Sequence, residues 1–326
     1  MMTPRERFIK ALRREPIQGH VPHFELVMFL TMEAIGRIHP LHRDYSQWYQ
    51  MSAAERRLHL VDMAKAYIET AEKYHHSAIF VHPNPGPNGE MPDDIESTRA
   101  ILETIRELSG DTYFLMIHGD PTYPIPTGDT MMEFSTMMYE EPEKLHDGTK
   151  RKVEFAQKLC DEMHKHPGLL DGWALCSDYC FNVNPFYSRD MFAEFVQPYL
   201  KEILDYYRAN GYYSIKHTDG NVMPILDMIV DCGPDAVHSL DPQGGVDLAE
   251  AKRLYGDRVC LIGNVNCGLM QTGTEEELVE DVRRALRQGM PGYGYIFSTS
   301  NCAFTGLELK RYELMNRIWW EEGIYQ

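Results

Sequence analysis

Short apolar runs alternate with longer amphipathic stretches along this chain. Eight of the apolar runs are rich in β-branched and aromatic residues and are too short for helices, which is typical of buried strands. They span residues 21–27, 77–82, 112–118, 169–178, 212–217, 235–240, 258–265 and 294–300. We therefore predict eight strands with helices between them.

The stretches between these runs carry helix signals. Residues 53–74 and 189–209 place apolar side chains at helical spacing, so each predicts a helix with one buried face. Thr274, followed three residues later by Glu277, predicts a capping box at the start of a further helix. Strand–helix alternation of this kind indicates a mainly parallel sheet.

About eight such units in 326 residues favour one closed (β/α)8 barrel, or TIM barrel, covering residues 1–326 as a single domain. The alternative is a doubly wound open sheet, which usually carries a glycine-rich phosphate-binding turn after its first strand. Here the first predicted strand continues into ELVMFLTMEA, residues 25–34, with no such turn. The α/β barrel is therefore the predicted fold class.

Composition excludes several classes of partner. The formal net charge is -17, from 49 acidic and 32 basic residues, so the surface repels the phosphates of nucleic acids. No segment approaches the roughly 20 apolar residues of a membrane span, and MMTPRERFIKALRRE lacks the apolar core of a signal peptide. The seven cysteines include no CxxC pair, which indicates a reducing compartment. We expect a cytoplasmic protein that binds neither nucleic acid nor membrane.

Polar residues stand where the predicted strands end, and in a barrel these ends form the rim that carries the chemistry. A single aspartate or asparagine at such a place is usually a turn former or a helix cap, and a single histidine is usually structural. Here nearly every strand contributes one, which indicates a shared site. In chain order they are Glu25, His82, His118 with Asp120, Asp178, His217 with Asp219, Asp241, Asn264 with Asn266, and Cys302.

The stretch SIKHTDGN concentrates this signal. His217 and Asp219 are two residues apart and therefore share one face of a strand, and Gly220 allows the chain to turn after them. The alternative is that Asp219 caps the following helix, predicted in VMPILDMIV. Capping and metal ligation do not exclude each other.

Several segments together resemble the uroporphyrinogen decarboxylase superfamily, in order along essentially the whole chain and most strongly from Asp178 onward. They are TPRERFIKALRRE with VPHFEL, then HTDGN, YGDRVCLIGNVN, GTEEELVEDVRRAL and GYGYIFSTSN. The resemblance implies a (β/α)8 barrel enzyme. The superfamily includes decarboxylases of the haem pathway and cobalamin-linked methyltransferases.

One departure from the decarboxylase pattern and one partial match to the methyltransferase pattern favour the methyltransferase branch. The segment that matches the arginine-rich RQAGRY-like region reads HFELVMFLTMEAIGRIHP, with Arg37 as its one arginine, whereas gripping a polycarboxylate needs several. Methyltransferases of this family commonly hold zinc with His-x-Cys and a later cysteine. The resemblance therefore implies zinc ligands His217, Asp219 in place of the first cysteine, and Cys302, and aspartate remains a competent zinc ligand. The alternative for Cys302 is an ordinary buried residue.

The favoured hypothesis is a zinc-assisted methyltransferase that moves a methyl group between a small substrate and the corrinoid of a partner protein. Asp178, Glu25 and Asp219 are the expected catalytic carboxylates, as general acids or in the metal shell. The expected substrate-binding residues are His82, His118, Tyr179, Asp241 and Asn264. The alternatives are a metal-free decarboxylase of a small carboxylated substrate and a non-catalytic ligand-binding barrel.

Two long loops rich in proline and glycine, at residues 81–94 and 118–130, predict lids or pocket walls beside this rim. The Met-rich stretch after the second loop, from Met131 to Met138, either adds an apolar lining for a ligand or packs as ordinary core.

Overall fold

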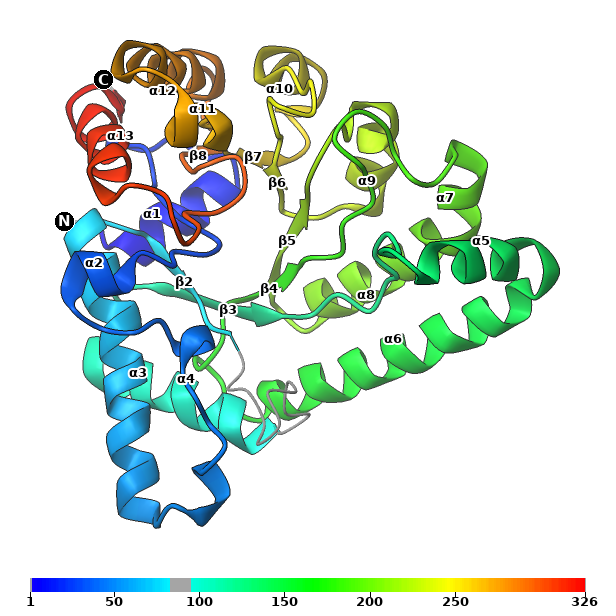
Figure 1. Ribbon diagram of the computed structural model, residues 1–326, viewed down its shortest axis with the longest axis horizontal. Coiled ribbons are helices and arrows are strands. Elements are labelled where there is room, and N and C mark those ends of the chain that lie inside the picture. The colour runs from blue at the N-terminus through cyan, green and yellow to red at the C-terminus, as the bar shows by residue number, and fades with distance from the viewer. Residues whose placement is uncertain (1, 83–94, 326) are drawn as a thin grey trace.

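The computed structural model describes residues 2–82 and 95–325, and its centre is a curled parallel sheet in which the strands follow chain order (Figure 1). Every neighbouring pair of strands is parallel. The strands are β2 (Ala78–Phe80), β3 (Phe114–His118), β4 (Gly172–Leu175), β5 (Tyr213–Thr218), β6 (Ala236–Ser239), β7 (Cys260–Ile262) and β8 (Tyr295–Ile296). The sheet therefore has seven strands and the shape of a half-barrel.

The first predicted strand, residues 21–27, forms isolated bridges instead of a ladder. His23 forms a parallel bridge with His76 at the β2 edge and another with Phe297 at the β8 edge. Its carbonyl also accepts the N–H of Ser77 at 2.7 Å. The segment therefore lies between the two edges of the sheet, in the place predicted for strand one, but its pairing is too short to count as a strand.

Most of the helices lie on the outer face of the sheet, and the first one closes the N-terminal end of its curl. The helices are α1 (Pro4–Leu12), α2 (Thr31–Ile35), α3 (Ala53–Tyr74), α4 (Ile95–Ser109), α5 (Thr130–Glu140), α6 (Pro142–His164), α7 (Arg189–Phe195), α8 (Gln197–Ala209), α9 (Leu226–Cys232), α10 (Leu248–Tyr255), α11 (Cys267–Thr272), α12 (Glu275–Gly289) and α13 (Leu309–Glu322). The 3-10 turns are η1 (Pro40–His42), η2 (Trp48–Gln50) and η3 (Met223–Ile225). A short antiparallel pair, β1 (Gly19–His20) with β9 (Ile324–Tyr325), joins the two ends of the chain. None of the helices in the described parts is both long and apolar enough to cross a membrane.

The predicted helix signals are confirmed, with one exception. α3 covers the whole predicted stretch, and the reciprocal bonds of Thr274 and Glu277 start α12. The predicted helix over 189–209 is instead two helices, α7 and α8, with a break at Val196. Pro198 explains the break, because proline has no N–H to continue the bonding pattern of the preceding helix.

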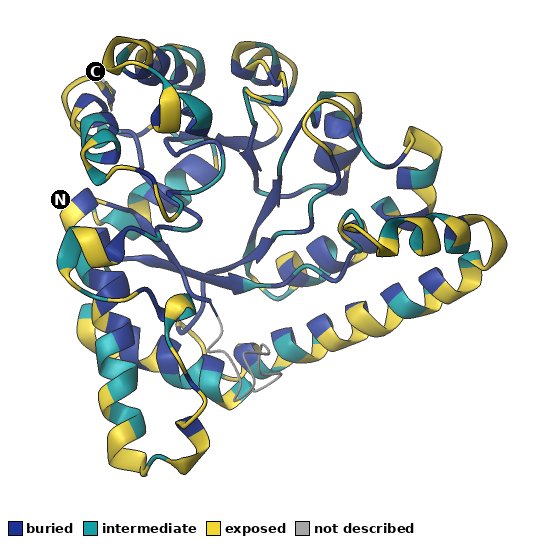
Figure 2. Ribbon diagram, viewed as in Figure 1, coloured by how far each residue is buried: buried dark blue, intermediate teal, exposed yellow. Residues whose placement is uncertain are grey.

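The apolar core has two parts, one inside the curl of the sheet and one between the sheet and the helices. The inner part is sealed at the N-terminal end of the strands by α1, where Phe8 packs against Phe24 and Phe114 with ring centroids 5.7 and 4.8 Å apart. Figure 2 shows burial concentrated on the strands and on the sides of the helices that face them. The opposite end of the strands is where polar side chains collect.

Candidate functional site

The inner face of the sheet changes from apolar to polar toward the C-terminal ends of the strands. Side chains two residues apart share a face, so each strand can be followed along its inner row. The inner apolar residues are Phe80, Met116, Cys176, Ile215, Ala236 and Ile296, and two positions later stand His82, His118, Asp178, His217, His238 and Ser298. Asn264, two positions after Ile262, instead accepts a hydrogen bond at 3.0 Å from Arg284 of the outer helix α12. A polar layer therefore covers the apolar interior, and His82, His118, Asp178 and His217 of the predicted rim residues belong to it.

Three of these side chains form a compact cluster. The potential ligand atoms of Asp178, His217 and Asp219 all lie within 4.8 Å of one another. His217 Nε2 is 3.7 Å from Asp178 Oδ1 and 3.6 Å from Asp219 Oδ1. One imidazole nitrogen and two carboxylate oxygens are a donor set that zinc and similar divalent cations accept. We call Asp178, His217 and Asp219 the acid–histidine cluster.

Asp219 is held firmly in this cluster. Its Oδ1 accepts a hydrogen bond from Ser239 Oγ at 2.9 Å, and its Oδ2 accepts one from Asn301 Nδ2 at 2.6 Å. Its own N–H donates to Asp178 Oδ1 at 2.9 Å. Burial raises the pKa of Asp219 above its usual range, with His217 acting against this shift and Asp178 adding to it. Neither η3 nor α9 has a side-chain cap, so the interpretation of Asp219 as a helix cap is not what the structure shows.

Cys302, the third expected metal ligand, is not a member of the cluster, and Asp178 occupies the third position instead. Burial raises the pKa of the Cys302 thiol to about 12, and the neighbouring Cys267, Glu25 and Asp219 act in the same direction. The thiol is therefore protonated at neutral pH unless a cation lowers its pKa.

Glu25 lies deeper than the rim position predicted for it. Its carboxylate is buried and accepts hydrogen bonds from Thr299 Oγ1 at 2.6 Å and from Ser298 Oγ at 3.3 Å. Ser298 Oγ is in turn 3.5 Å from His238 Nε2, and His238 Nδ1 is 2.8 Å from His217 Nδ1. The parallel register of β5 and β6 sets His238 beside His217. Glu25 thus reaches the acid–histidine cluster through two residues that were not predicted from the sequence.

Neutral imidazoles form one side of the polar layer. The ring of His82 lies 5.5 Å from that of His118 and 5.7 Å from that of His39. Burial lowers the pKa of His118 to about 4 and that of His39 to about 3, and it lowers the pKa of His82 well below its usual range. Within the described chain, His82 Nε2 is buried without a hydrogen-bond partner.

Because these histidines are buried, we expect the free energy of unfolding to depend on pH. One substitution can measure the contribution of His39 to this dependence. A group whose pKa is lower in the folded state takes up a proton on unfolding, so stability is lost as pH falls from about 6.5 toward the folded pKa. For His39 this amounts to about 1.4 kcal/mol per pH unit near pH 5. His39→Asn keeps an acceptor for the N–H of Leu41, and we expect it to reduce the slope of unfolding free energy against pH by that amount. Denaturant unfolding at pH 4.5–7.5 measures this slope, and an unchanged slope would contradict the prediction.

A buried ion pair lies beside the polar layer. Lys216 is fully buried, and its Nζ donates to Asp120 Oδ2 and to the carbonyl of Ser177, both at 2.7 Å. Burial raises the pKa of Asp120, but Lys216 and the donors Thr122 and Ser177 outweigh it, so that the pKa lies below its usual range. Lys216 was not predicted to be important, because a lysine inside the apolar run YYSIKH carries no motif.

The other three predicted substrate-binding residues are mostly engaged by the protein itself. Tyr179 is fully buried, with its hydroxyl 2.7 Å from Thr122 Oγ1. Asn264 is also fully buried and donates to the carbonyl of Leu240 at 2.7 Å. Asp241 is half-buried near the rim, and burial raises its pKa. The structure thus leaves Asp241 nearer to solvent than the other two.

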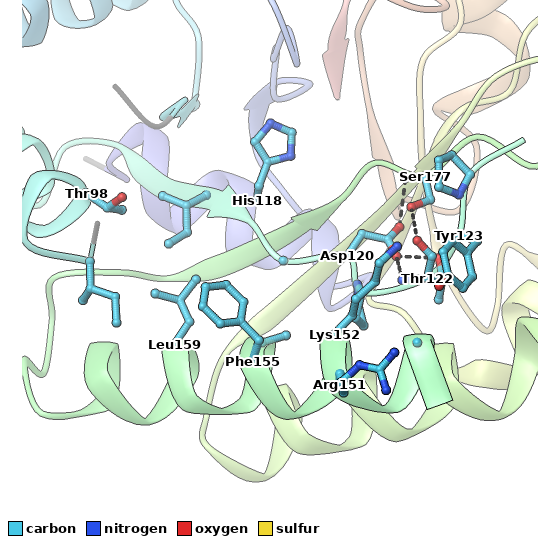
Figure 3. A pocket seen from close by; sticks show the side chains of 17 residues that line it. Thr98, His118, Asp120, Thr122, Tyr123, Arg151, Lys152, Phe155, Leu159 and Ser177 are labelled. Carbon is cyan, nitrogen blue, oxygen red and sulfur yellow. Dashed lines mark hydrogen bonds between the residues drawn. The ribbon is translucent and has the colours of Figure 1, made fainter. Parts of the chain in front are cut away.

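A groove of about 750 Å³ runs between the loop after β3 and the middle of α6 (Figure 3). Its wall is largely apolar, from Ile117, Phe155 and Leu159, and Arg151 and Lys152 supply positive charge. Neither of these two side chains has an ion-pair partner in the described part of the chain, although Lys152 Nζ lies 3.7 Å from the centre of the Tyr123 ring. Residues 118–124 of the second predicted loop form one wall, with His118 among the lining residues. Most of the first predicted loop, residues 83–94, lies outside the described residues.

The fold and the polar layer define a class of protein, the α/β proteins whose parallel strands deliver polar groups to one end of a curled sheet. The family model for uroporphyrinogen decarboxylase (URO-D) matches residues 122–317. The chain belongs to this family, as its sequence motifs predicted. Members of this family are enzymes, among them uroporphyrinogen decarboxylases.

The chain is similar to known proteins in sequence and in fold. The chain is 29% identical to uroporphyrinogen decarboxylase of Chlorobium luteolum over 163 residues, which is 47% of this chain and 41% of that protein. It is 26% identical to uroporphyrinogen decarboxylase of Shewanella loihica over 241 residues, covering 66% and 59%. The chain thus spans only about two to three fifths of the length of these relatives. In structure it is similar to a methyltransferase from Methanosarcina mazei, with a TM-score of 0.74, 17% identity and coverage of 98% and 99%, a likeness that concerns the fold.

Proposed function

We propose that this protein is a methyltransferase that moves a methyl group between a small substrate and the corrinoid of a partner protein. The observation that carries the proposal is the acid–histidine cluster at the C-terminal ends of β4 and β5. It stands at the end of a parallel sheet where such folds carry their chemistry. The end-to-end likeness in fold to a methyltransferase supports the same branch of the superfamily.

The cluster fits a divalent metal by the chemistry of its donors. His217 Nε2 and one oxygen each of Asp178 and Asp219 would hold the ion, and Cys302, whose thiol senses the charge of Asp219, is the thiol candidate that the family pattern implies. Zinc bound there would supply Lewis acidity toward a substrate oxygen or thiol. Ser239 and Asn301 orient Asp219 by direct hydrogen bonds, which is the kind of support that ligating carboxylates receive in metal sites.

The groups around the cluster suit a small and weakly charged substrate. His118 and His82 offer neutral rings, because burial holds both pKa values low. The groove beside His118 has the volume of a small-molecule site and a mainly apolar wall. We propose that it accommodates part of the substrate or of the corrinoid.

A polycarboxylate such as uroporphyrinogen has few partners here. Arg37, the one arginine of the segment that matches the substrate-gripping region of the decarboxylases, is ion-paired with Asp62 and Glu69. Those partners lie on α3, and they take up the N–H donors of the Arg37 guanidinium that a substrate carboxylate would need.

We therefore expect no decarboxylation of uroporphyrinogen above background and about one zinc per chain. Metal analysis of the purified protein and an assay of the products of uroporphyrinogen check these two expectations. An established uroporphyrinogen decarboxylase serves as the positive control. Robust conversion would overturn the choice of the methyltransferase branch, and a metal-free protein would remove the role of zinc.

A second candidate is a decarboxylase of a small carboxylated substrate. The curated relatives are decarboxylases, and the side chains of Arg151 and Lys152 in the groove can bind a carboxylate. Release of CO2 from a panel of small carboxylates, without added corrinoid protein, distinguishes this candidate. Binding of ligands without any turnover would instead indicate a non-catalytic barrel.

Two coarser features of the proposal concern the whole chain. We propose that residues 21–28 take the place of the remaining strand of a closed eight-stranded barrel. The bridges of His23 to both edges of the sheet support this. We also propose that the protein acts in the cytoplasm, since its seven cysteines are all free.

A further inference from the structure

Four buried side chains form a continuous line from the wall of the sheet to the acid–histidine cluster. Glu25 accepts from Ser298 Oγ at 3.3 Å, and Ser298 Oγ lies 3.5 Å from His238 Nε2. His238 Nδ1 lies 2.8 Å from His217 Nδ1. We call these residues the Glu25–His217 line. All four are buried, so water does not compete for these bonds.

The direction of hydrogen donation along this line follows from its first member. A carboxylate can only accept, and Glu25 also receives the N–H and the hydroxyl of Thr299. Ser298 therefore gives its single hydroxyl hydrogen to Glu25 and offers its lone pairs to His238. His238 then carries its hydrogen on Nε2, which leaves its Nδ1 bare.

A bare Nδ1 on His238 determines the state of His217. The two Nδ1 atoms at 2.8 Å share one hydrogen, because two N–H groups would repel and two lone pairs would form no bond. Since His238 has no hydrogen at Nδ1, the hydrogen belongs to His217. In the neutral ring, the form that binds a metal, the Nε2 of His217 then keeps its lone pair on the side of Asp178 and Asp219.

We propose that Glu25, acting through Ser298 and His238, fixes His217 as the tautomer that presents a bare Nε2 to the acid–histidine cluster. His238 is then a positioning residue, and the site is preset to receive a cation before any is bound. The use of this site for methyl transfer rests on the proposed function, whereas the tautomer itself does not.

The distances around His217 favour this tautomer over the other. With its hydrogen on Nε2, His217 would donate to one of the two carboxylates. The separations of 3.6 and 3.7 Å are longer than all contacts of the Glu25–His217 line, which lie between 2.8 and 3.5 Å. The short contact lies on the Nδ1 side instead. The hydrogen bond of His217 is therefore made by Nδ1, toward His238, and not by Nε2.

The first test reads the tautomer directly in metal-free protein. We expect ¹⁵N NMR of histidine-labelled protein to show His217 protonated at Nδ1 and unprotonated at Nε2, with the reverse for His238. Spectra of His217→Ala and His238→Phe assign the signals. A hydrogen on Nε2 of His217 would overturn the proposal, whatever the protein does with zinc or a methyl donor.

The second test measures zinc affinity by competition with a chelator. Partners that orient a metal-binding histidine typically contribute 10–100-fold to affinity, so we expect His238→Phe to weaken zinc binding by about that factor. His238→Asn keeps an acceptor near the position of Nδ1 and should lose only a few-fold. The zinc affinity of Ser298→Ala, a smaller change, should lie between that of the wild type and that of His238→Phe. His76→Phe, the same replacement of a buried histidine outside the line, should leave affinity unchanged.

The outcomes separate the two levels of the proposal. Wild-type affinity in His238→Phe would show that the line does not position His217. Absence of zinc binding in the wild type, with the expected tautomer in the NMR spectrum, would refute the metal site of the proposed function and leave the tautomer proposal standing. Thermal unfolding of each variant confirms that the losses do not arise from misfolding.

Discussion

Asp120→Asn is expected to destabilise the fold by about 3–5 kcal/mol, because it leaves the fully buried ammonium of Lys216 without its counter-charge. The carbonyls of Ser177 and Leu175 would remain as hydrogen-bond acceptors, but they carry no net charge. The carboxylate side of the pair is only 5% exposed, so water cannot replace it. Denaturant unfolding at pH 7.5 measures the effect.

Two controls separate the ion pair from other causes. The double variant Asp120→Asn with Lys216→Met removes both charges and should recover most of the lost stability, because a buried pair often contributes little against an apolar replacement. Asp205→Asn breaks the exposed pair with Lys201 and should change stability by less than about 0.5 kcal/mol. A cost below about 1 kcal/mol for Asp120→Asn would mean that water reaches Lys216 or that the lysine is neutral.

Local signals explain why much of the fold could be predicted from the sequence. The start of α12 depends on Thr274 and Glu277, which are neighbours in the chain, and the inner rows of the strands follow a two-residue period. The same period leads from apolar interior residues to the rim, so Asp178, His217 and Asp219 could be proposed as neighbours before the structure was known. The pairing of residues 21–27 depends on the two edges of the sheet, which are distant in the sequence. The apolar pattern therefore predicted a strand there, but it did not reveal that the segment forms only isolated bridges.

The residues that were missed carry no local signal. His238 and Lys216 lie inside apolar runs and resemble core positions, and only the packing of strands reveals their partners. Conversely, Tyr179 and Asn264 have the chemistry of ligand-binding groups, but their hydrogen bonds are used within the protein. Cys302 was assigned from the family pattern, and the loop geometry that places Asp178 in the cluster instead is not encoded in spacing.

The largest effect on function is expected at the acid–histidine cluster. His217→Ala should lower zinc affinity by more than about 100-fold, since even partners one step removed from the metal contribute 10–100-fold. Methyl transfer to the corrinoid protein should fall to background, while the fold persists because His217 belongs to the polar layer rather than the apolar core. His164→Ala replaces an exposed histidine at the end of α6 and should change neither quantity.

A set of three further variants identifies the ligands beside His217. Asp178→Asn and Asp219→Asn should each be nearly as severe as His217→Ala if both carboxylates bind zinc, because a neutral amide is a poor zinc ligand. Cys302→Ala should then be mild, and it should be severe instead if the thiol binds the metal, as the family pattern implies. Zinc content and methyl-transfer rate are measured together for all three. Undiminished methyl transfer by a metal-free protein would rule out the zinc role, and His217 and Asp219 would then serve as hydrogen-bonding groups for a polar substrate.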